Sequence, residues 1–539
     1  MKKLLSVFAV CAAALIAGTS VYAADPATAS TASTATSATT SATTAASAID
    51  ENDLFGGDSS GIDAGGVSDG TATANGTSSA TGTTGMTGTA KASAVSSFLK
   101  TDAVRIGGSY SGSLSPSWTW TNPWNGSFKL NTPDSAKLTP DVGAKVFFDA
   151  RPDEDTRFYG SMKASWPFEN KSTFLTGATY VPAISAGPYS IPASVSTTTG
   201  TISAPNLKVF ELFADRSWND TLFFRFGKHT VKWGVGYFWS PADVINVSSI
   251  DVTDPSAQLE GPISLRLQIP FAGTQNNIWA YAVVPAGIDA AELKPYDIGY
   301  AAKYEFLLGN YEIGMGGFWQ RNVAPKAMLT ATGAVWKFNL FGEAVASWGS
   351  DKQWVDSITL PLSATSVKTS KDDDGVYFSG TAGFQYSDTT NNYSVTAQYF
   401  YNGNGYSYSR RKDLINDARS MLSRLSGTSA EAAMTGVFKG LMYQSGEHYA
   451  GLYLGKTKFL SDDLTLGLLT IANLSDISGF TQPSASYTFF KGFSGSLNPT
   501  FYWAAPVLWG ANSDAEYVVM TDGPSMTLSF KASLGGGSF

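Results

Sequence analysis

Side chains that could act as a nucleophile, a general base or a metal ligand are few in this chain. It has two histidines, His229 and His448, and no nucleophile elbow, paired helix histidines or metal-like cysteine spacing. Asp251, Asp254 and Glu260 could bind calcium, but they follow no regular ligand spacing, so a solvated acidic loop is favoured. We therefore expect no enzyme activity, metal or cofactor. An enzyme would need one of the histidines beside a serine or an aspartate in the folded chain.

Charged residues recur instead at every second position of apolar segments. Arg157 and Lys163, for example, alternate with Phe158 and Met162. A period of two indicates a β-strand with two different faces. A lysine or arginine facing lipid at the middle of a bilayer would cost about 2–4 kcal/mol, so the charged face is expected to line a water-filled interior. The candidate pore-lining residues are Arg157, Lys163, Arg225, Arg266, Lys303 and Glu305.

The clearest pair of strands lies in residues 376–401. Two arms alternate apolar and polar residues, and the polar turn 388–392 separates them, which is a hairpin signal. Each arm has about 10 residues, enough to cross a bilayer when tilted, whereas strands of soluble domains usually have about 5–6. Lipid offers no hydrogen-bond partner to an open sheet edge, so strands of this kind must close into a barrel.

The same pattern recurs from residue 103 to the end and predicts an all-β, antiparallel transmembrane barrel. Its connections alternate between long and short, as the loops and turns of bacterial barrels do, whereas a soluble β-sandwich would not show this alternation. A slip within 310–336 or 447–503 would leave sixteen strands. The eighteen predicted strands are 103–114, 140–149, 156–166, 206–215, 220–228, 262–271, 276–285, 296–307, 310–320, 326–336, 338–349, 375–387, 392–403, 447–458, 463–474, 483–491, 493–503 and 525–535.

Two segments precede the barrel, which is expected to span residues 98–539. Residues 1–23 have a basic start, an apolar stretch and a small-residue cleavage site, the pattern of a secretory signal peptide. Residues 24–97 consist mainly of Ala, Ser, Thr and Gly and are expected to be disordered, because they cannot bury enough apolar surface. The single cysteine, Cys11, lies in the signal, so no disulfide is expected.

The net charge gives no reason to expect a nucleic-acid partner. The formal charge of the chain is −8, but much of the acidity lies in residues 24–97, which hold seven acids and one lysine. Residues 98–539 hold 33 basic and 37 acidic side chains. A nearly balanced barrel gives only a weak argument for ion selectivity.

Residues 222–246 resemble a strand-and-loop signature of bacterial outer-membrane porin-like barrels. The match includes Gly227, Trp233, Gly234, Asp243 and Asn246, whereas the Arg-Gln pair and the final proline of the signature are replaced. The resemblance implies a channel in the outer membrane of a bacterial cell. The aromatic loop after this strand could fold into the lumen or belong to the outer aromatic girdle, and the residues favour neither.

The C-terminal strand also resembles a known signal. Apolar and polar residues alternate over 525–535 and the chain ends at Phe539, as in strands that the outer-membrane barrel-assembly machinery recognises. Three glycines, 535–537, put Phe539 out of register with the apolar face unless a bulge restores it.

The connection 404–446 stops alternating and is expected to form two short helices. The first has apolar residues three to four positions apart between Leu414 and Leu425, and the second between Met434 and Leu441. These helices need a surface to pack on, and the barrel rim or lumen wall is the nearest. We hypothesise that the connection constricts the pore and favours anions; it could instead face solvent or contact lipid phosphates. The basic residues concerned are Arg410, Arg411, Lys412, Arg419 and Arg424.

These patterns predict a channel for passive diffusion of small polar solutes, embedded in outer-membrane lipid. A structural or adhesive barrel that displays long surface loops is the alternative.

Overall fold

The computed structural model describes residues 104–538 apart from gaps at 122, 124–129, 182–183, 187–188, 192–193, 256, 258, 289–290, 359–366, 426–443, 506–513 and 520–523. For 170–204, 367, 424–425 and 536–538 only the backbone is described. The predicted signal peptide, the segment 24–97, Phe539 and the second helix expected in 404–446 lie outside the described residues.

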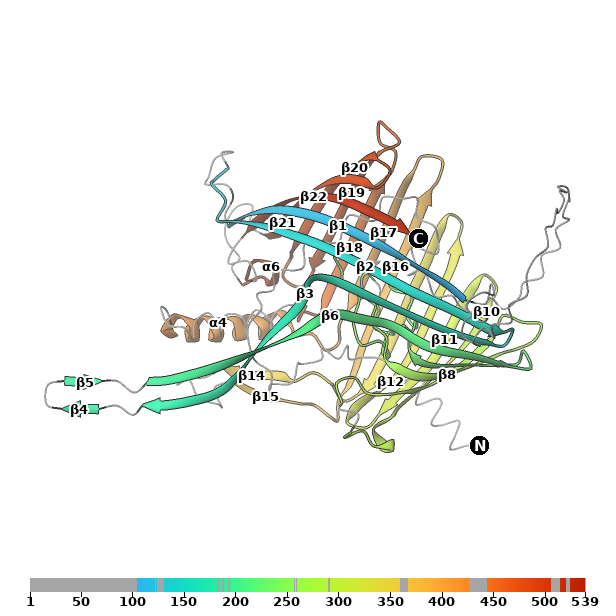
Figure 1. The fold of residues 1–539 in the computed structure, drawn as a ribbon, viewed down its shortest axis with the longest axis horizontal. Coiled ribbons are helices and arrows are strands. Elements are labelled where there is room, and N and C mark those ends of the chain that lie inside the picture. Colours follow the sequence, from blue (N-terminus) through green and yellow to red (C-terminus); the bar gives the residue numbers. More distant parts are fainter. Residues whose placement is uncertain are drawn as a thin grey trace, which may run out of the picture.

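Eighteen antiparallel strands form one closed sheet, in which each strand pairs with its neighbours along the chain and β1 pairs with β22 (Figure 1). The prediction of eighteen strands is confirmed, and each predicted range overlaps one of them. They are β1 (Val104–Thr121), β2 (Ser135–Asp153), β3 (Thr156–Val181), β6 (Ser194–Trp218), β7 (Leu222–Lys228), β8 (Ile263–Pro270), β9 (Asn277–Val283), β10 (Gly299–Leu308), β11 (Tyr311–Gln320), β12 (Val323–Val335), β13 (Phe338–Trp348), β16 (Val376–Asp388), β17 (Tyr393–Tyr401), β18 (His448–Lys456), β19 (Leu464–Asn473), β20 (Ser478–Phe490), β21 (Phe493–Ala504) and β22 (Ser525–Ser538).

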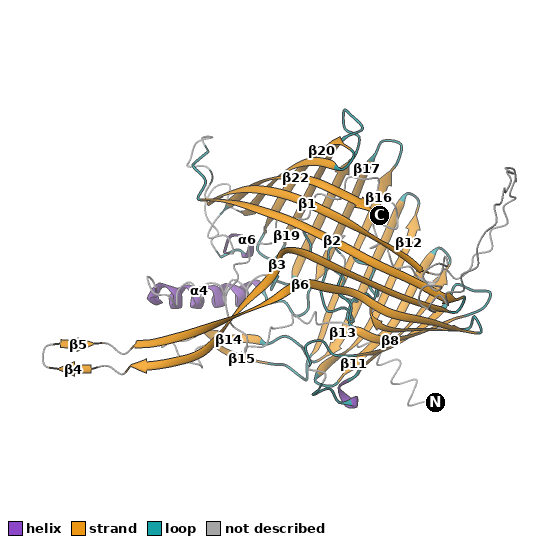
Figure 2. Cartoon of the chain, viewed as in Figure 1, coloured by secondary structure: helices purple, strands orange, loops and turns teal. Residues whose placement is uncertain are grey.

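The two ends of the barrel differ. At one, which we call the turn end, connections are as short as 154–155, 309–310 and 491–492. At the other, the loop end, long connections carry the helices α4 (Tyr408–Leu425) and α6 (Glu516–Val519) and the small sheet of β14 (Trp354–Ile358) and β15 (Val367–Ser370) (Figure 2).

Two connections expected to be long loops are mostly strand. Within 167–205, β3 and β6 continue past the barrel as a paired ribbon towards the short strands β4 (Ile184–Ala186) and β5 (Tyr189–Ile191) (Figure 1). Within 475–482, β20 already begins at Ser478. Backbone pairing alone satisfies the N–H and C=O groups of such extensions, so they do not need an alternating side-chain pattern.

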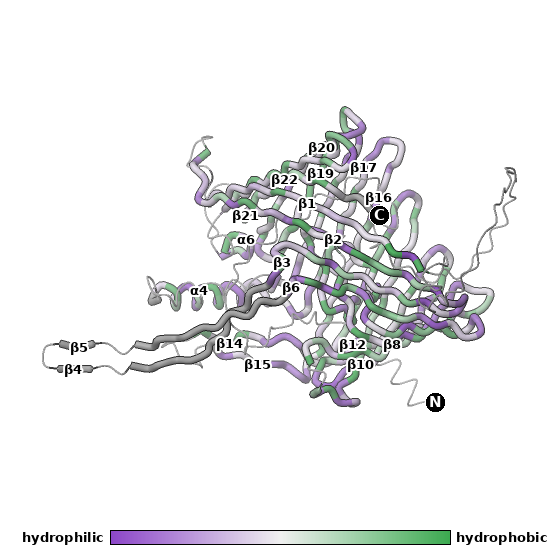
Figure 3. Tube along the Cα trace, in the orientation of Figure 1, coloured by the Kyte–Doolittle hydropathy of each residue, from purple (hydrophilic) through white to green (hydrophobic). Residues whose placement is uncertain are grey.

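The two faces of the barrel wall differ as the alternation predicts. Phe158, Phe226 and Leu265 face outward and are 45%, 61% and 44% exposed, although they are apolar. The residues beside them, such as Arg157 and Arg225, are buried inside. Alternating hydropathy is visible along the barrel strands in Figure 3. An apolar exterior and a polar interior are the inverse of a soluble barrel.

The closing strand contains the bulge that its glycines allow. The pairing of β1 with β22 shifts between Tyr110 and Ser111, which lie opposite Gly537 and Gly535. Gly535 has a φ of +112°, a conformation that residues with a Cβ rarely adopt. The three glycines therefore let the end of the last strand change register without losing its partner strand.

Among the described residues, no helix is long and apolar enough to cross a membrane.

Candidate functional site: an internal loop facing a charged wall

The connection from His229 to Pro262 folds into the barrel instead of projecting from it. Trp233 and Phe238 are 2% and 0% exposed, and each belongs to a cluster of buried side chains inside the barrel. Lys303 on the inward face of β10 donates a hydrogen bond to the carbonyl oxygen of Trp233, at 2.9 Å. Of the two placements that the sequence left open, the structure shows the lumen. We call residues 229–262 the internal loop.

The carboxylate of Glu343, on the inward face of β13, is the main anchor of the internal loop. Its Oε1 atom accepts hydrogen bonds from the backbone N–H groups of Val235, at 2.5 Å, and Gly236, at 2.6 Å, and from Ser240 Oγ, at 2.9 Å. Its Oε2 atom accepts another from the N–H of Ala242, at 2.8 Å. Charge-assisted bonds of this kind are roughly twice as strong as neutral ones. One wall carboxylate thus holds a whole turn of loop backbone.

Gln398 of β17 is a second anchor on the neighbouring part of the wall. Its Oε1 atom accepts hydrogen bonds from the N–H groups of Tyr237, at 3.0 Å, and Phe238, at 2.6 Å. Its Nε2 atom donates to the carbonyl oxygen of Trp239, at 2.6 Å, and to Thr381 Oγ1, at 2.6 Å. Both ends of the amide are therefore used, which fixes the loop against β16 and β17.

The residues of the sequence signature serve to brace the internal loop. Asn246 accepts a hydrogen bond from the N–H of Val231, at 2.9 Å, and donates to both carboxylate oxygens of Asp243, at 2.8 and 2.9 Å. Burial raises the pKa of Asp243 to about 7, and the nearby Glu343 adds to the rise, whereas the Asn246 amide opposes it. Gly234 is required for close approach, because a Cβ there would lie 1.6 Å from Ser240 Oγ.

A row of charged and aromatic side chains crosses the inner wall beside the internal loop. Arg157, Asp215, Arg225, Arg266 and Tyr281 lie directly opposite one another on the adjacent strands β3, β6, β7, β8 and β9. Asp215 binds Arg225 through two hydrogen bonds, at 2.6 and 2.9 Å.

The cations of this row are not all matched by carboxylates. Arg157 is 2.8 Å from Asp149 and 3.9 Å from Asp215. Arg266 lies over the ring of Trp279, at 5.3 Å, and among the described residues no carboxylate is within ion-pair distance of it. With Asp149 counted beside it, the row holds three arginines and two aspartates, so it presents a net positive charge to the lumen.

The other candidate pore-lining residues also lie on inward faces. Lys303 pairs with Glu305, at 2.7 Å. Lys163 is directly opposite Lys145 on β2 and Lys208 on β6. Like charges placed opposite each other are destabilising in a sheet, which a wet interior makes tolerable. The structure thus brings Arg157, Arg225 and Arg266 into one row and places Lys163 and the Lys303–Glu305 pair elsewhere on the inner wall.

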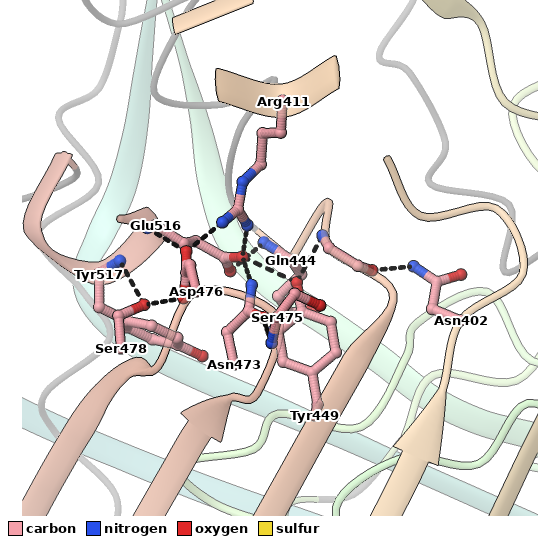
Figure 4. A network of polar contacts seen from close by, with 11 residues as sticks. Asn402, Arg411, Gln444, Tyr449, Asn473, Ser475, Asp476, Ser478, Glu516 and Tyr517 are labelled. Atoms are coloured by element: carbon pink, nitrogen blue, oxygen red, sulfur yellow. Dashed lines mark hydrogen bonds and ion pairs between the residues drawn. The ribbon is translucent and has the colours of Figure 1, made fainter. Parts of the chain in front are cut away.

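At the loop end, a buried set of polar groups joins three connections, and we call it the mouth network (Figure 4). Arg411 of α4 donates hydrogen bonds to Glu516 of α6, at 2.8 Å, and to Asp476 of the β19–β20 connection. Glu516 also accepts from Tyr449 Oη, at 2.8 Å, and from Asn473 Nδ2, at 2.7 Å. Burial raises the pKa of Glu516, and the Arg411 guanidinium opposes this rise.

Helix α4 confirms the first predicted helix, but it packs on a different surface. Leu414, Ile415 and Ala418 are buried against Val355 and Ile358 of β14 rather than against the barrel rim. Its basic residues are partly matched by acids. Arg410 is 3.3 Å from Asp356, Arg411 belongs to the mouth network, and Arg419 pairs with Asp514. Lys412 is exposed, and the side chain of Arg424 lies outside the described residues.

Lys352, beside β14, gives the loop end a testable pH dependence. Its Nζ atom donates to the carbonyl oxygen of Asn404, at 2.7 Å, and lies 3.8 Å from the ring centre of Tyr406. Burial lowers the pKa of Lys352 to about 7, the Arg410 guanidinium lowers it further, and Glu516 opposes them. Between pH 7 and its ordinary pKa near 10.5, the unfolded segment binds more protons than the folded one, so the folded form gains stability as pH rises.

We expect hydrogen exchange of residues 349–358 and 402–407 to slow as pH rises from 7 to 9, after correction for the intrinsic exchange rate. A Lys352→Met variant should lose this extra dependence. An identical profile in both proteins would contradict the assignment to Lys352.

The two histidines lie on different faces of the barrel. His229 is fully buried, with Nδ1 3.1 Å from the carbonyl oxygen of Gly227. His448 shares a 2.7 Å hydrogen bond with Tyr399 Oη on the outer wall. Within the described part of the chain, neither ring is hydrogen-bonded to a serine or an aspartate.

Sequence reasoning missed the anchors Glu343 and Gln398 and the hub Glu516. Glu343 and Gln398 each lie at an inward position of a strand that was predicted correctly. A lone carboxylate between Gly342 and Ala344 was the available signal, but its partners are more than 100 residues away.

No protein-family model and no curated protein matches the chain. Solved structures similar to it include OccAB1 of Acinetobacter baumannii, at 12% sequence identity and a TM-score of 0.40, covering 80% of this chain and 96% of that chain. OccK8 (OprE) of Pseudomonas aeruginosa shows 12% identity and a TM-score of 0.37, covering 80% and 98%. The outer membrane channel DcaP of A. baumannii shows 10% identity and a TM-score of 0.34, covering 80% and 97%.

Proposed function

We propose that the protein is a porin-like channel of the bacterial outer membrane, through which small polar solutes diffuse passively. The observation that carries the proposal is a closed eighteen-stranded barrel with an apolar outer face and charged or hydrogen-bonding side chains inside. Among β-sheets, only a closed one satisfies every backbone group in lipid. A polar lumen lowers the cost of removing water from a solute, so transport needs no cofactor.

The internal loop is proposed to form the narrow part of the passage. It is anchored on β10, β13 and β17 by hydrogen bonds with Lys303, Glu343 and Gln398, and it carries the acids Asp243, Asp251, Asp254 and Glu260. An acidic loop would then face a basic wall across the passage. The pore-lining residues proposed on this basis are Arg157, Lys163, Arg225, Arg266, Lys303 and Glu305.

The connection 404–446 is proposed to affect solute entry at the loop end, which would be the mouth of the pore, and not to constrict the lumen itself. Acids already match Arg410, Arg411 and Arg419, so any attraction of anions by the described part of this connection would depend mainly on Lys412. We further propose that β22 is the strand that the barrel-assembly machinery engages.

Single-channel recording in planar bilayers tests the function. Discrete conductance steps from the purified full chain are expected. A barrel that is folded and shifts its gel mobility on heating, but conducts nothing, would favour a displayed structural or adhesive barrel instead.

Replacing Arg266 by glutamine is expected to weaken any preference for anions. A unit charge about 8 Å from an ion contributes about 0.5–2 kcal/mol for dielectric constants between water and a protein surface. The reversal potential in a salt gradient should move towards that of a less anion-selective pore. Arg216→Gln, at the exposed turn end, is the matched control, because it removes the same charge and its ion-pair partners are the turn residues Asp153 and Asp155. Equal reversal potentials for both variants would contradict a role for Arg266 in the lumen.

Residues 24–97 are expected to be dispensable for barrel assembly, because they carry no strand pattern. A variant with the signal peptide fused directly to Phe98 should still give a protease-resistant, heat-modifiable barrel at normal amounts. Failure of this variant alone, with the full chain assembling normally, would mean that the segment acts as a plug or a chaperone contact.

A further inference from the structure

The outer wall carries an apolar groove of about 450 Å³ across the adjacent strands β16, β17, β18 and β19. It lies on the face that would meet lipid, whereas Tyr449 and Asn473 of the mouth network are on the inner face of the same wall. Its outward-facing lining includes the alanines Ala382, Ala397, Ala450 and Ala472.

The strand register explains the groove. Ala382 is opposite Tyr399, which is opposite Ala450, which is opposite Ala472. Three of these four side chains are alanines, which end at Cβ, so the outer surface is recessed along this row of register partners. Bulkier outward residues rise beside it, such as Phe378, which is 52% exposed, and Leu454, which is 37% exposed.

Polar groups mark the end of the groove nearest the loop end. The Tyr399 hydroxyl shares a hydrogen bond of 2.7 Å with His448 Nδ1, and the ring of Tyr401 lies 5.2 Å from that of His448. Tyr401 is the last residue of β17 and His448 is the first of β18, so both lie where a membrane strand meets the polar head-group region. The groove is therefore amphipathic along its length, with an apolar body and a polar end.

We propose that this groove is a binding site for one membrane lipid, with an acyl chain in the groove and the head group at Tyr399 and His448. A second copy of the chain is a poorer fit, since a stable protein interface buries about 1,200–2,000 Å² and a narrow groove does not provide a broad face. The hydrocarbon of the bilayer already surrounds this face, and a chain that fills the groove keeps dispersion contacts that a void would lose. The site requires insertion in a bilayer but not an open channel.

A photoactivatable phosphatidylethanolamine with a diazirine in its acyl chain tests the site. The full-length protein is reconstituted in vesicles of phosphatidylethanolamine and phosphatidylglycerol that contain a small fraction of this probe. We expect several-fold more cross-linking to peptides within 376–401 and 448–473 than to other outward strands. Ala450→Phe should reduce this excess to the level of the other strands. Ala532→Phe, on the outward face of β22, is the matched control and should leave it unchanged.

Even labelling around the barrel, or an unchanged excess in Ala450→Phe, would overturn the proposal. It would also be overturned if the groove were unlabelled and Ala450→Phe instead dissociated an oligomer seen by native mass spectrometry, because a second copy would then be the occupant. If Ala450→Phe does not assemble, Ala472→Leu fills the same groove more mildly. The single-channel conductance of these variants is expected to equal that of the parent, because the groove is on the outer wall. The cross-linking result therefore tests the lipid site, and the conductance tests the channel function, independently of each other.

Discussion

Replacing Glu343 by alanine is expected to raise single-channel conductance and its fluctuation more than any other single change inside the barrel. The substitution leaves the N–H groups of Val235, Gly236 and Ala242 without their acceptor. Each unsatisfied buried donor costs about 1–3 kcal/mol. The summed free-energy cost of three such donors is larger than the stabilisation we expect from the remaining contacts of this turn. The internal loop should therefore leave its position on the wall for part of the time.

Glu312→Ala is the matched control for this prediction. Glu312 is also a carboxylate on the inward face, on β11, but it is exposed. It interacts with Lys232 of the internal loop through charge, and among the described residues it accepts no hydrogen bond from the loop backbone. Planar-bilayer recordings should show larger, noisier steps for Glu343→Ala than for Glu312→Ala. Gln398→Ala should act in the same direction, because it removes the second anchor. Identical step sizes for the parent, Glu343→Ala and Glu312→Ala would mean that Glu343 does not hold a constriction.

The strands could be predicted because a membrane barrel imposes one local rule at every position. Outward side chains must be apolar and inward ones are polar, so the period of two reveals both the strand and its facing. The starts of strands were less accurate where prolines occur. Pro140, Pro325 and Pro483 lie inside β2, β12 and β20, although each was placed at or just before the start of its strand. Proline lacks an N–H, so it suggests a boundary even where the ladder tolerates it.

The anchors of the site could not be predicted, because they depend on contacts between distant parts of the chain. Alternation places Glu343 inside the barrel, but only the fold brings the turn at 235–242 to it. The aromatic residues of the internal loop fit lumen and girdle equally well by composition. Hydrogen bonding decides between them: the loop's buried N–H groups need acceptors, and Glu343 and Gln398 supply them.

The mouth network is where a single substitution should most affect the loop end. Arg411→Met would leave Glu516 and Asp476 buried beside each other without their cation. Removing one partner of a buried ion pair costs about 3–5 kcal/mol, because the remaining charge has neither water nor a counterion. The barrel strands make none of their ladder hydrogen bonds through this arginine. We therefore expect local loosening of 402–447, 474–477 and 505–524 and a barrel that still assembles.

Limited proteolysis of the reconstituted protein measures this loosening. Cleavage within 402–447 and 505–524 should be much faster in Arg411→Met than in the parent, while the heat-modifiable shift of the barrel on gels is retained. Arg410→Met is the matched control, one residue away on the same helix. Its ion pair with Asp356 is substantially exposed, and exposed pairs contribute about 0–1 kcal/mol, so cleavage should hardly change.

A neutral version of the network separates the loss of charge balance from the loss of packing. The triple variant Arg411→Met, Asp476→Asn, Glu516→Gln removes every charge of the buried set and keeps side chains of similar size. Replacing a buried ion pair by uncharged groups of similar volume is often nearly neutral, unlike breaking it on one side. The triple variant should therefore resist protease better than Arg411→Met alone. Equal cleavage of Arg411→Met and Arg410→Met would show that the pairing of Arg411 with Glu516 and Asp476 does not hold these three connections together.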